Sequence, residues 1–208
     1  DICKLIFEKI EIKNPATNGM RQTPLHLAAG NGHFDVCNLI IEKVEDKNPK
    51  RQDNLWTPLH YATKFGRSEI VKIIVAVCED KNPKDYLGYT PLHEAALDGN
   101  LALCKLIIEN VTDKNPRDSI GTTPLHKAAK CGYLDICKLI IERINDKNPA
   151  DNDGWTPLHC AAVNGHLDIC RLMIEKVEYI HPVNNSGETP KNLADELNYI
   201  KVSKLFLP

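Results

Sequence analysis

The chain has 208 residues, 42% of them hydrophobic and 26% charged, with a formal net charge of -2 at pH 7. This apolar content is sufficient for a folded unit and excludes an intrinsically disordered chain. Because Lys and Asp or Glu alternate along the sequence, no basic stripe is present for a phosphate backbone, and we expect no nucleic acid partner. No stretch approaches the roughly 20 apolar residues of a membrane span, and no leader with a cleavage site opens the chain, so we expect a soluble chain without membrane insertion.

The first predicted element is a helix at residues 1–13. Asp1 to Ile10 has nearly the same sequence as Asp135 to Ile144, and both segments open with Asp-Ile-Cys-Lys-Leu-Ile. Variants of this phrase start at Asp35, Glu69, Ala102 and Asp168. Each later copy follows another predicted helix, which starts at a Thr-Pro pair. Because the first copy lacks it, we expect the chain to be cut from a longer array.

The phrase Thr-Pro-Leu-His fixes the period of the sequence. Its intervals are 34, 33, 33 and 33 residues, and its five copies start at Thr23, Thr57, Thr90, Thr123 and Thr156. A degenerate sixth copy starts at Thr189. The phrase Asp-Lys-Asn-Pro keeps the same register, starting at Asp46, Asp80, Asp113 and Asp146, with a looser copy at residues 12–15. A fixed period of this length predicts a stack of repeated supersecondary units.

Each unit is predicted to contain two helices, as the fourth full unit illustrates. The Thr123 hydroxyl can cap free N–H groups, and Pro124 lacks the donor that would be unpaired at the first helical position. This helix should end near Cys131, where Gly132 follows. The next helix presents one apolar face, formed by Ile136, Cys137, Leu139, Ile140 and Ile144. The Asn-Pro that follows prevents continuation, and a turn-rich segment predicts an extended or hairpin crossing to the next unit.

The last unit differs at positions that the other units are expected to bury. Lys191 replaces the repeated Leu, Asn192 the His and Asp195 the second Ala. Polar groups on a face that a neighbour would cover predict a C-terminal capping unit. The sequence therefore predicts a single domain over residues 1–208, with a partial unit at 1–13, full units at 14–47, 48–81, 82–114, 115–147 and 148–180, and a capping unit at 181–208.

The phrase Asp-x-x-Gly-x-Thr-Pro-Leu-His-x-Ala-Ala, found at 85–96, 118–129 and 151–162, resembles the ankyrin repeat signature. The in-register copies cover essentially the whole chain. The resemblance implies an all-α solenoid of stacked helix-turn-helix units joined by β-hairpin loops. Two differences from the commonest form are Asp-Lys-Asn-Pro in place of Gly-Ala-Asp-Val-Asn-Ala and one additional residue before Thr23 and Thr57. Such units bury their faces only against neighbours, which makes a continuous core.

Cysteines are predicted to be core residues. Five of the eight share one repeat position, namely Cys3, Cys37, Cys104, Cys137 and Cys170. In another unit Val71 occupies this position, which indicates a small apolar site. Stacked helices lie roughly 8–10 Å apart, beyond the ~7 Å limit for the alpha carbons of a disulfide. Zinc needs about four ligands, whereas local His and Cys pairs offer two. We expect neither disulfides nor a metal, and free thiols favour an intracellular, cytoplasmic setting.

Neither catalysis nor a cofactor is predicted. The ankyrin resemblance assigns a structural role, joining neighbouring repeats, to the motif histidines His26, His60, His93, His126 and His159. The serines occupy unrelated repeat positions, so no acyl-transfer triad is indicated. Glycines occur singly at turns, which argues against a Gly-rich phosphate loop.

Variable residues at exposed positions are the candidate partner site. In ankyrin proteins the hairpin tips and the exposed side of the first helix usually bind, so the resemblance implies contacts from Trp56, Tyr61, Lys64, Phe65, Tyr86, Leu87, Tyr89, Glu94, Leu97, Asp98, Ile120, Lys127, Lys130 and Trp155. Aromatic residues are enriched in interface hot spots. Each tryptophan can instead pack against the neighbouring hairpin. The acidic Glu94 and Asp98, followed by Lys127 and Lys130, either select a partner by charge or pair with each other.

The sequence thus predicts a protein-protein interaction module, a scaffold or adaptor, that binds a protein or peptide in a concave groove as a monomeric domain of a longer chain. Two alternatives stay open: a recognition domain for an enzyme, channel or effector domain outside this segment, and a mechanical spacer. The resemblance also implies that one set of asparagines in the loops is either hydroxylated or has only a structural role in the turn. These are Asn48, Asn82, Asn115 and Asn148.

Overall fold

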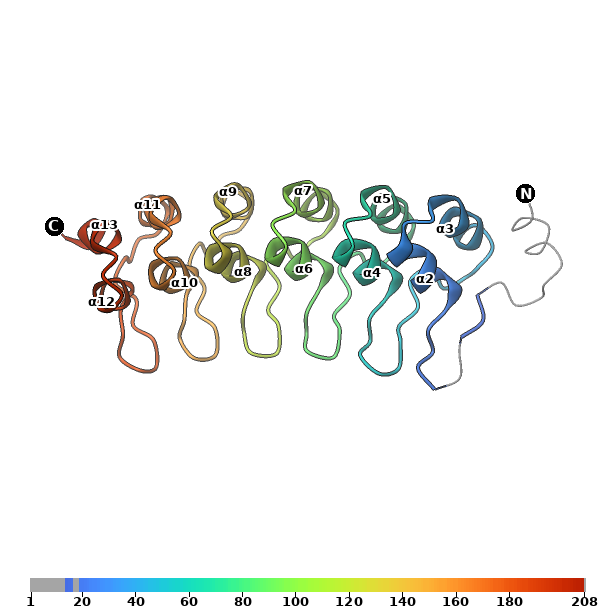
Figure 1. Cartoon of the computed structure of the whole chain (residues 1–208), viewed down its shortest axis with the longest axis horizontal. Coiled ribbons are helices and arrows are strands. Elements are labelled where there is room, and N and C mark those ends of the chain that lie inside the picture. Colours follow the sequence, from blue (N-terminus) through green and yellow to red (C-terminus); the bar gives the residue numbers. More distant parts are fainter. Residues whose placement is uncertain (1–13, 17–18, 208) are drawn as a thin grey trace.

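The computed structural model describes residues 14–16 and 19–207, which form an elongated stack of helix pairs (Figure 1). A first row lies beside the loops and consists of α2 (Pro24–Asn31), α4 (Pro58–Lys64), α6 (Pro91–Leu97), α8 (Pro124–Cys131), α10 (Pro157–Val163) and α12 (Pro190–Glu196). A second row consists of α3 (Phe34–Ile41), α5 (Ser68–Val77), α7 (Leu101–Asn110), α9 (Leu134–Ile141), α11 (Leu167–Lys176) and α13 (Ile200–Ser203), followed by the 3-10 helix η1 (Lys204–Phe206). The helix predicted at 1–13 lies outside the described residues.

Every helix of the first row begins at a Thr-Pro pair. In α8 the Thr123 backbone N–H donates to Nδ1 of His126 at 3.2 Å, and the same reciprocal cap starts the other five. As predicted, α8 ends at Cys131, and Gly132 follows with φ 84°. The second helix of this unit is shorter than its apolar pattern predicted. It ends at Ile141, so Ile144 is partly buried beyond the helix.

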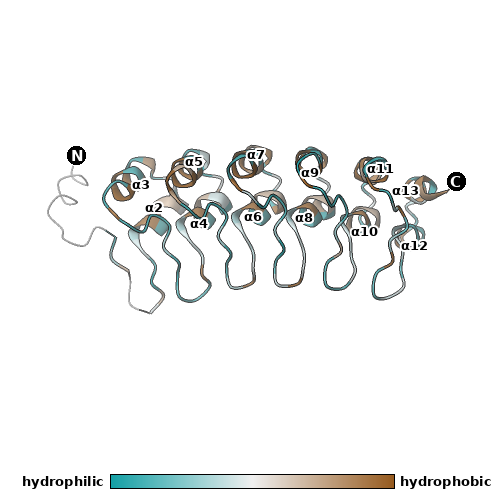
Figure 2. Cartoon of the chain, turned by 180° about the vertical axis from the view of Figure 1, so that it is seen from behind, coloured by the Kyte–Doolittle hydropathy of each residue, from teal (hydrophilic) through white to brown (hydrophobic). Residues whose placement is uncertain are grey.

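Apolar side chains fill the seams between neighbouring helix pairs and form one continuous core. Figure 2 shows the hydrophobic residues concentrated in the helices. The motif leucines are completely buried at Leu25, Leu59, Leu92, Leu125 and Leu158. Four described cysteines share the position of buried Val71 and are equally inaccessible: Cys37, Cys104, Cys137 and Cys170. The predicted core role of these four is confirmed, and burial raises the pKa of each thiol to about 12; Cys3 lies outside the described residues.

The Asp-Lys-Asn-Pro segment connects the end of one helix pair to the start of the next. The Asp46 carboxylate accepts from the Asn48 backbone N–H at 3.1 Å and closes a turn. The Lys47 ammonium donates at 2.7 and 2.8 Å to two carbonyls at the end of α3. The Asn48 side-chain oxygen accepts from the Leu59 N–H at 3.0 Å, a donor that the first turn of α4 leaves free. Later copies repeat the two side-chain caps around Asn115 and Asn148.

The connections between units are tight turns, and the described residues contain no β-strand. The Asp85 N–H donates to the Tyr89 carbonyl at 2.8 Å, and the Asp85 carboxylate accepts from the Tyr89 N–H at 2.8 Å. Each turn then contacts the next through a backbone bond, as from Ser119 N–H to the Leu87 carbonyl at 2.8 Å. The expected hairpin loops are therefore turns joined edge to edge.

The additional residue in the first two loops changes one backbone position. Two residues before the motif Thr, Gly88 has φ 76°, in the left-handed region that glycine adopts freely. At the same place in the first two loops, Arg21 has φ 54° and Leu55 has φ 59°. These side chains therefore occupy a strained conformation.

The motif histidines tie successive units together, as the resemblance implied. Each Nε2 lies 3.0–3.4 Å from a backbone carbonyl in the next unit. Because Nδ1 accepts from the capping Thr, Nε2 carries the proton and the ring is neutral. Burial lowers the pKa of His26, His60, His93 and His126 to about 4. In the last unit Asn192 makes the same cap, with its oxygen 3.1 Å from the Thr189 nitrogen. Its side chain is shorter than that of histidine and has no group equivalent to Nε2.

Candidate partner-binding site

An aromatic cluster covers α4 at the N-terminal part of the candidate site. Tyr61 packs edge-on against Trp56 with ring centroids 5.4 Å apart and lies tilted to Phe65 at 6.5 Å. The Trp56 Nε1 donates to the Asp85 carboxylate at 3.2 Å, and the Tyr61 hydroxyl accepts from Arg51. Trp56 is thus held against the next turn, as the packing interpretation expected, whereas Phe65 is 55% exposed. The accessible aromatic face of this cluster is that of Phe65.

Lys64 pairs with two acidic side chains, one on α6 and one directly after it. Its ammonium lies 3.0 Å from the Glu94 carboxylate and 3.4 Å from that of Asp98. Glu94, predicted at an exposed position, is only 7% exposed. The carboxylates pair with the lysine of the preceding unit, and not with Lys127 or Lys130 of the following one. The hydrogen bond to Glu94 raises the pKa of Lys64.

The two lysines of α8 have different surroundings. The Lys127 ammonium lies 3.5 Å from the buried Asp118 carboxylate and 4.7 Å from the centre of the Tyr89 ring, over its face. Lys130 is exposed and makes no ion pair within the part of the chain that the structure describes. Lys130 is therefore the α8 cation that is available to a partner.

A cavity of about 600 Å³ lies between α6, α8 and α10, and we call it the hollow. Its lining brings together six of the predicted contact residues, namely Tyr89, Leu97, Ile120, Lys127, Lys130 and Trp155. The remaining lining residues are Thr122, His126, Cys131, Asp151, Cys160, Val163 and Asn164. Apolar side chains therefore dominate its walls.

The contacts predicted from the sequence did not include Cys131 and Cys160, although both line the hollow. Cys160 occupies the repeat position of Lys127, and Cys131 lies one helical turn after Lys127. Their positions in the repeat could therefore have identified both as candidate contacts. Burial raises the pKa of the Cys160 thiol to about 12. Two other predicted residues, Tyr86 (65% exposed) and Leu87 (46% exposed), lie on the preceding turn and do not line the hollow.

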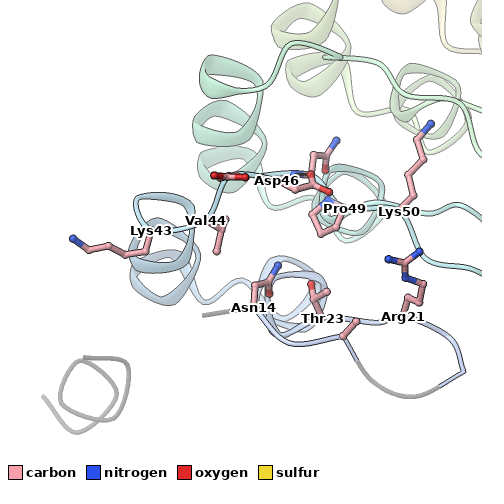
Figure 3. A pocket seen from close by; sticks show the side chains of 11 residues that line it. Asn14, Arg21, Thr23, Lys43, Val44, Asp46, Pro49 and Lys50 are labelled. Atoms are coloured by element: carbon pink, nitrogen blue, oxygen red, sulfur yellow. Dashed lines mark hydrogen bonds between the residues drawn. The ribbon is translucent and has the colours of Figure 1, made fainter. Parts of the chain in front are cut away.

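A larger cavity, about 980 Å³, lies elsewhere, beside the first described Asp-Lys-Asn-Pro segment. Asn14 and Thr23 face Asp46 and Pro49 across it, while Lys43 and Lys50 extend away (Figure 3). Smaller cavities lie beside the later copies of the same segment. This cavity is therefore a feature of the repeat seam and does not distinguish one site.

The described residues carry neither a cluster of metal ligands nor a membrane-spanning helix. No group of three or more His, Cys, Asp or Glu is arranged there to hold a metal ion. None of the helices in that part of the chain combines the length and apolar character that a bilayer crossing requires.

The stacked helix pairs, their shared seams and the histidine ties define a helical repeat solenoid. A family model for ankyrin repeats matches this chain in three copies, at residues 1–85, 77–151 and 143–208. The chain belongs to the ankyrin repeat family, whose repeats are generally protein-protein interaction modules. No curated protein matches it.

Proposed function

We propose that this chain is a non-enzymatic protein-binding module, a scaffold or adaptor, that holds a protein or peptide on the surface formed by its first-row helices and turns. The observation that carries the proposal is the hollow, whose apolar walls are open to solvent and whose rim includes Ile120, 60% exposed. Concave apolar sites with a few polar groups are the usual form of binding sites. Exposed apolar patches on soluble proteins mark interaction surfaces.

The ionisable groups near the hollow support binding over catalysis. His126 is neutral because burial lowers its pKa to about 4, and both ring nitrogens already have hydrogen-bond partners. Burial also holds the Cys160 thiol protonated at neutral pH. A general base is most effective with a pKa near the working pH, and the thiolate is the nucleophilic form of cysteine. These two groups are therefore poorly suited to either role.

The same surface serves equally well as the recognition part of a larger enzyme, channel or effector, which is the second candidate. A monomeric array in the cytoplasm accommodates both. Buried free thiols at four seams support a reducing compartment, because oxidation there would disrupt the core.

The test compares partner capture by the wild-type chain with capture by an Ile120→Ala, Trp155→Ala double variant. A Val77→Ala variant, which alters an exposed side chain on α5, is the matched control. Truncating a hot-spot residue costs about 2 kcal/mol, so partners of the hollow should be lost by the double variant alone. Equal recovery on all three proteins, at unchanged melting temperatures, would contradict the proposal.

A further inference from the structure

Lys64 and Lys130 occupy the same position two repeats apart, in the last turns of α4 and α8. The Lys64 ammonium pairs with carboxylates 30 and 34 residues further along the chain, at Glu94 and Asp98. The same two offsets from Lys130 lead to Cys160 and Asn164. The chain thus repeats the cation at the α8–α10 seam and replaces both of its anionic partners with neutral residues.

The neutral replacements line the hollow next to Lys130. The Asn164 amide donates to the Cys160 carbonyl at 2.8 Å, so it is already bound to its own helix. The one carboxylate in the lining, Asp151, accepts from the Trp155 and Asp153 backbone N–H groups at 2.8 and 3.0 Å. Lys130 therefore has no partner charge within the described residues, at the position where Lys64 has two.

The first-row positions equivalent to Lys130 lie on either side of it. They are Leu97 at the end of α6 and Val163 at the end of α10, and both line the hollow. Packed helices lie roughly 8–10 Å apart, and an extended chain advances ~3.3 Å per residue. An extended peptide crossing the three helices therefore meets an apolar, a cationic and a second apolar side chain about every three residues.

We propose that the hollow takes a peptide segment in which an Asp or Glu side chain pairs with Lys130 and bulky apolar side chains, about three residues before and after it, contact Leu97 and Val163. The partner carboxylate supplies the anion that Glu94 supplies within the chain at the α4–α6 seam. This inference rests on the proposed function and adds the chemistry of the partner.

The experiment selects random linear dodecapeptides, displayed with their C-termini fused, on the purified 208-residue chain. Fusion removes the terminal carboxylate as a source of the anion. Lys130→Gln removes the cation, and Cys160→Glu with Asn164→Asp supplies the anions within the chain. Lys138→Gln removes one exposed cation from α9 and is the charge-matched control. Circular dichroism melts confirm that each variant is folded.

The wild-type chain and Lys138→Gln should enrich peptides with an acidic residue flanked by apolar residues at the stated spacing. Lys130→Gln should lose the acidic preference and bind a wild-type-selected peptide about fivefold more weakly, the effect of an exposed charge pair. The Cys160→Glu, Asn164→Asp variant should show the same loss.

Alkylation of Cys131, which lines the hollow, against Cys78 at the end of α5 reports where each peptide binds. Peptides that protect Cys131 but carry no acidic preference, or a preference that survives Lys130→Gln, would overturn the inference while the proposed function stands. Failure of the wild-type chain to select any peptide that protects Cys131 would overturn both.

Discussion

The Nε2 of His126 lies 3.0 Å from the backbone carbonyl of Trp155, the residue before the motif Thr of the next unit. This contact joins two repeats through one side chain that also caps its own helix. The same arrangement occurs at every described seam and stops at Asn192. Removing this contact by substitution therefore measures its contribution to the free energy of unfolding.

Replacing His126 with Asn, the residue of the last unit, should keep the helix cap and remove the contact with the Trp155 carbonyl. A buried polar group left without its partner costs about 1–3 kcal/mol, so the free energy of unfolding in urea should fall by that amount. In the 208-residue chain, Asn192→His alters the equivalent position of the last described unit, which makes no such contact, and should change the free energy of unfolding by less than about 0.5 kcal/mol. Equal midpoints for His126→Asn and wild type would refute this role.

The motif histidines should make the array acid-sensitive. Burial lowers the folded-state pKa of His26, His60, His93 and His126 to about 4, and also lowers that of His159. The unfolded chain, with an ordinary pKa near ~6.5, then binds protons first as the pH falls. Stability is fully retained above about pH 6.5, declines between about 6.5 and 4, and is lowest below 4. Urea midpoints at several pH values across this window measure the decline, which should be shallower for His126→Asn; a flat profile would be inconsistent with buried neutral rings.

Arg21→Gly should stabilise the protein. Arg21 has φ 54°, a conformation that costs a side chain about 1–2 kcal/mol, and its side chain is exposed, so little packing is lost. Glycine has a greater chain entropy in the unfolded state, which offsets part of this relief. The expected gain in the free energy of unfolding is roughly 0.5–1 kcal/mol. The reverse change, Gly88→Ala, should destabilise because its added carbon would lie 2.9 Å from the Ser119 nitrogen. Thermal melts of both variants check the opposite signs.

Thr63→Val should also stabilise the protein. The Thr63 hydroxyl is buried without a hydrogen-bond partner in the described part of the chain, at a position where the other full units have alanine. Removing an unpaired buried hydroxyl while keeping the side-chain volume should raise the free energy of unfolding by about 1 kcal/mol. Thr63→Ser, which keeps the hydroxyl and loses a methyl group, should lower it. A lower melting temperature for Thr63→Val would indicate that the hydroxyl has a partner in solution.

The sequence by itself determined the repeat, the helix starts and the seam residues of this protein. Thr-Pro, the following His and Asp-Lys-Asn-Pro act on backbone groups only a few residues away, and the period repeats their effect. Helix ends were less determined, since Ile144 continues the apolar pattern but lies beyond α9. An apolar residue such as Ile144 can pack against the core from a non-helical segment, so an apolar pattern does not fix where a helix ends.

Only the tertiary structure decided which candidate site residues have partners. Lys64 and Lys130 are the same residue at the same repeat position, yet only Lys64 pairs with carboxylates. Phe65 and Trp56 are both aromatic, yet Trp56 is held by Asp85. Each outcome depends on side chains about thirty residues away, brought across a seam by stacking. Local sequence patterns specify helices, whereas charge pairing and exposure depend on the facing repeat.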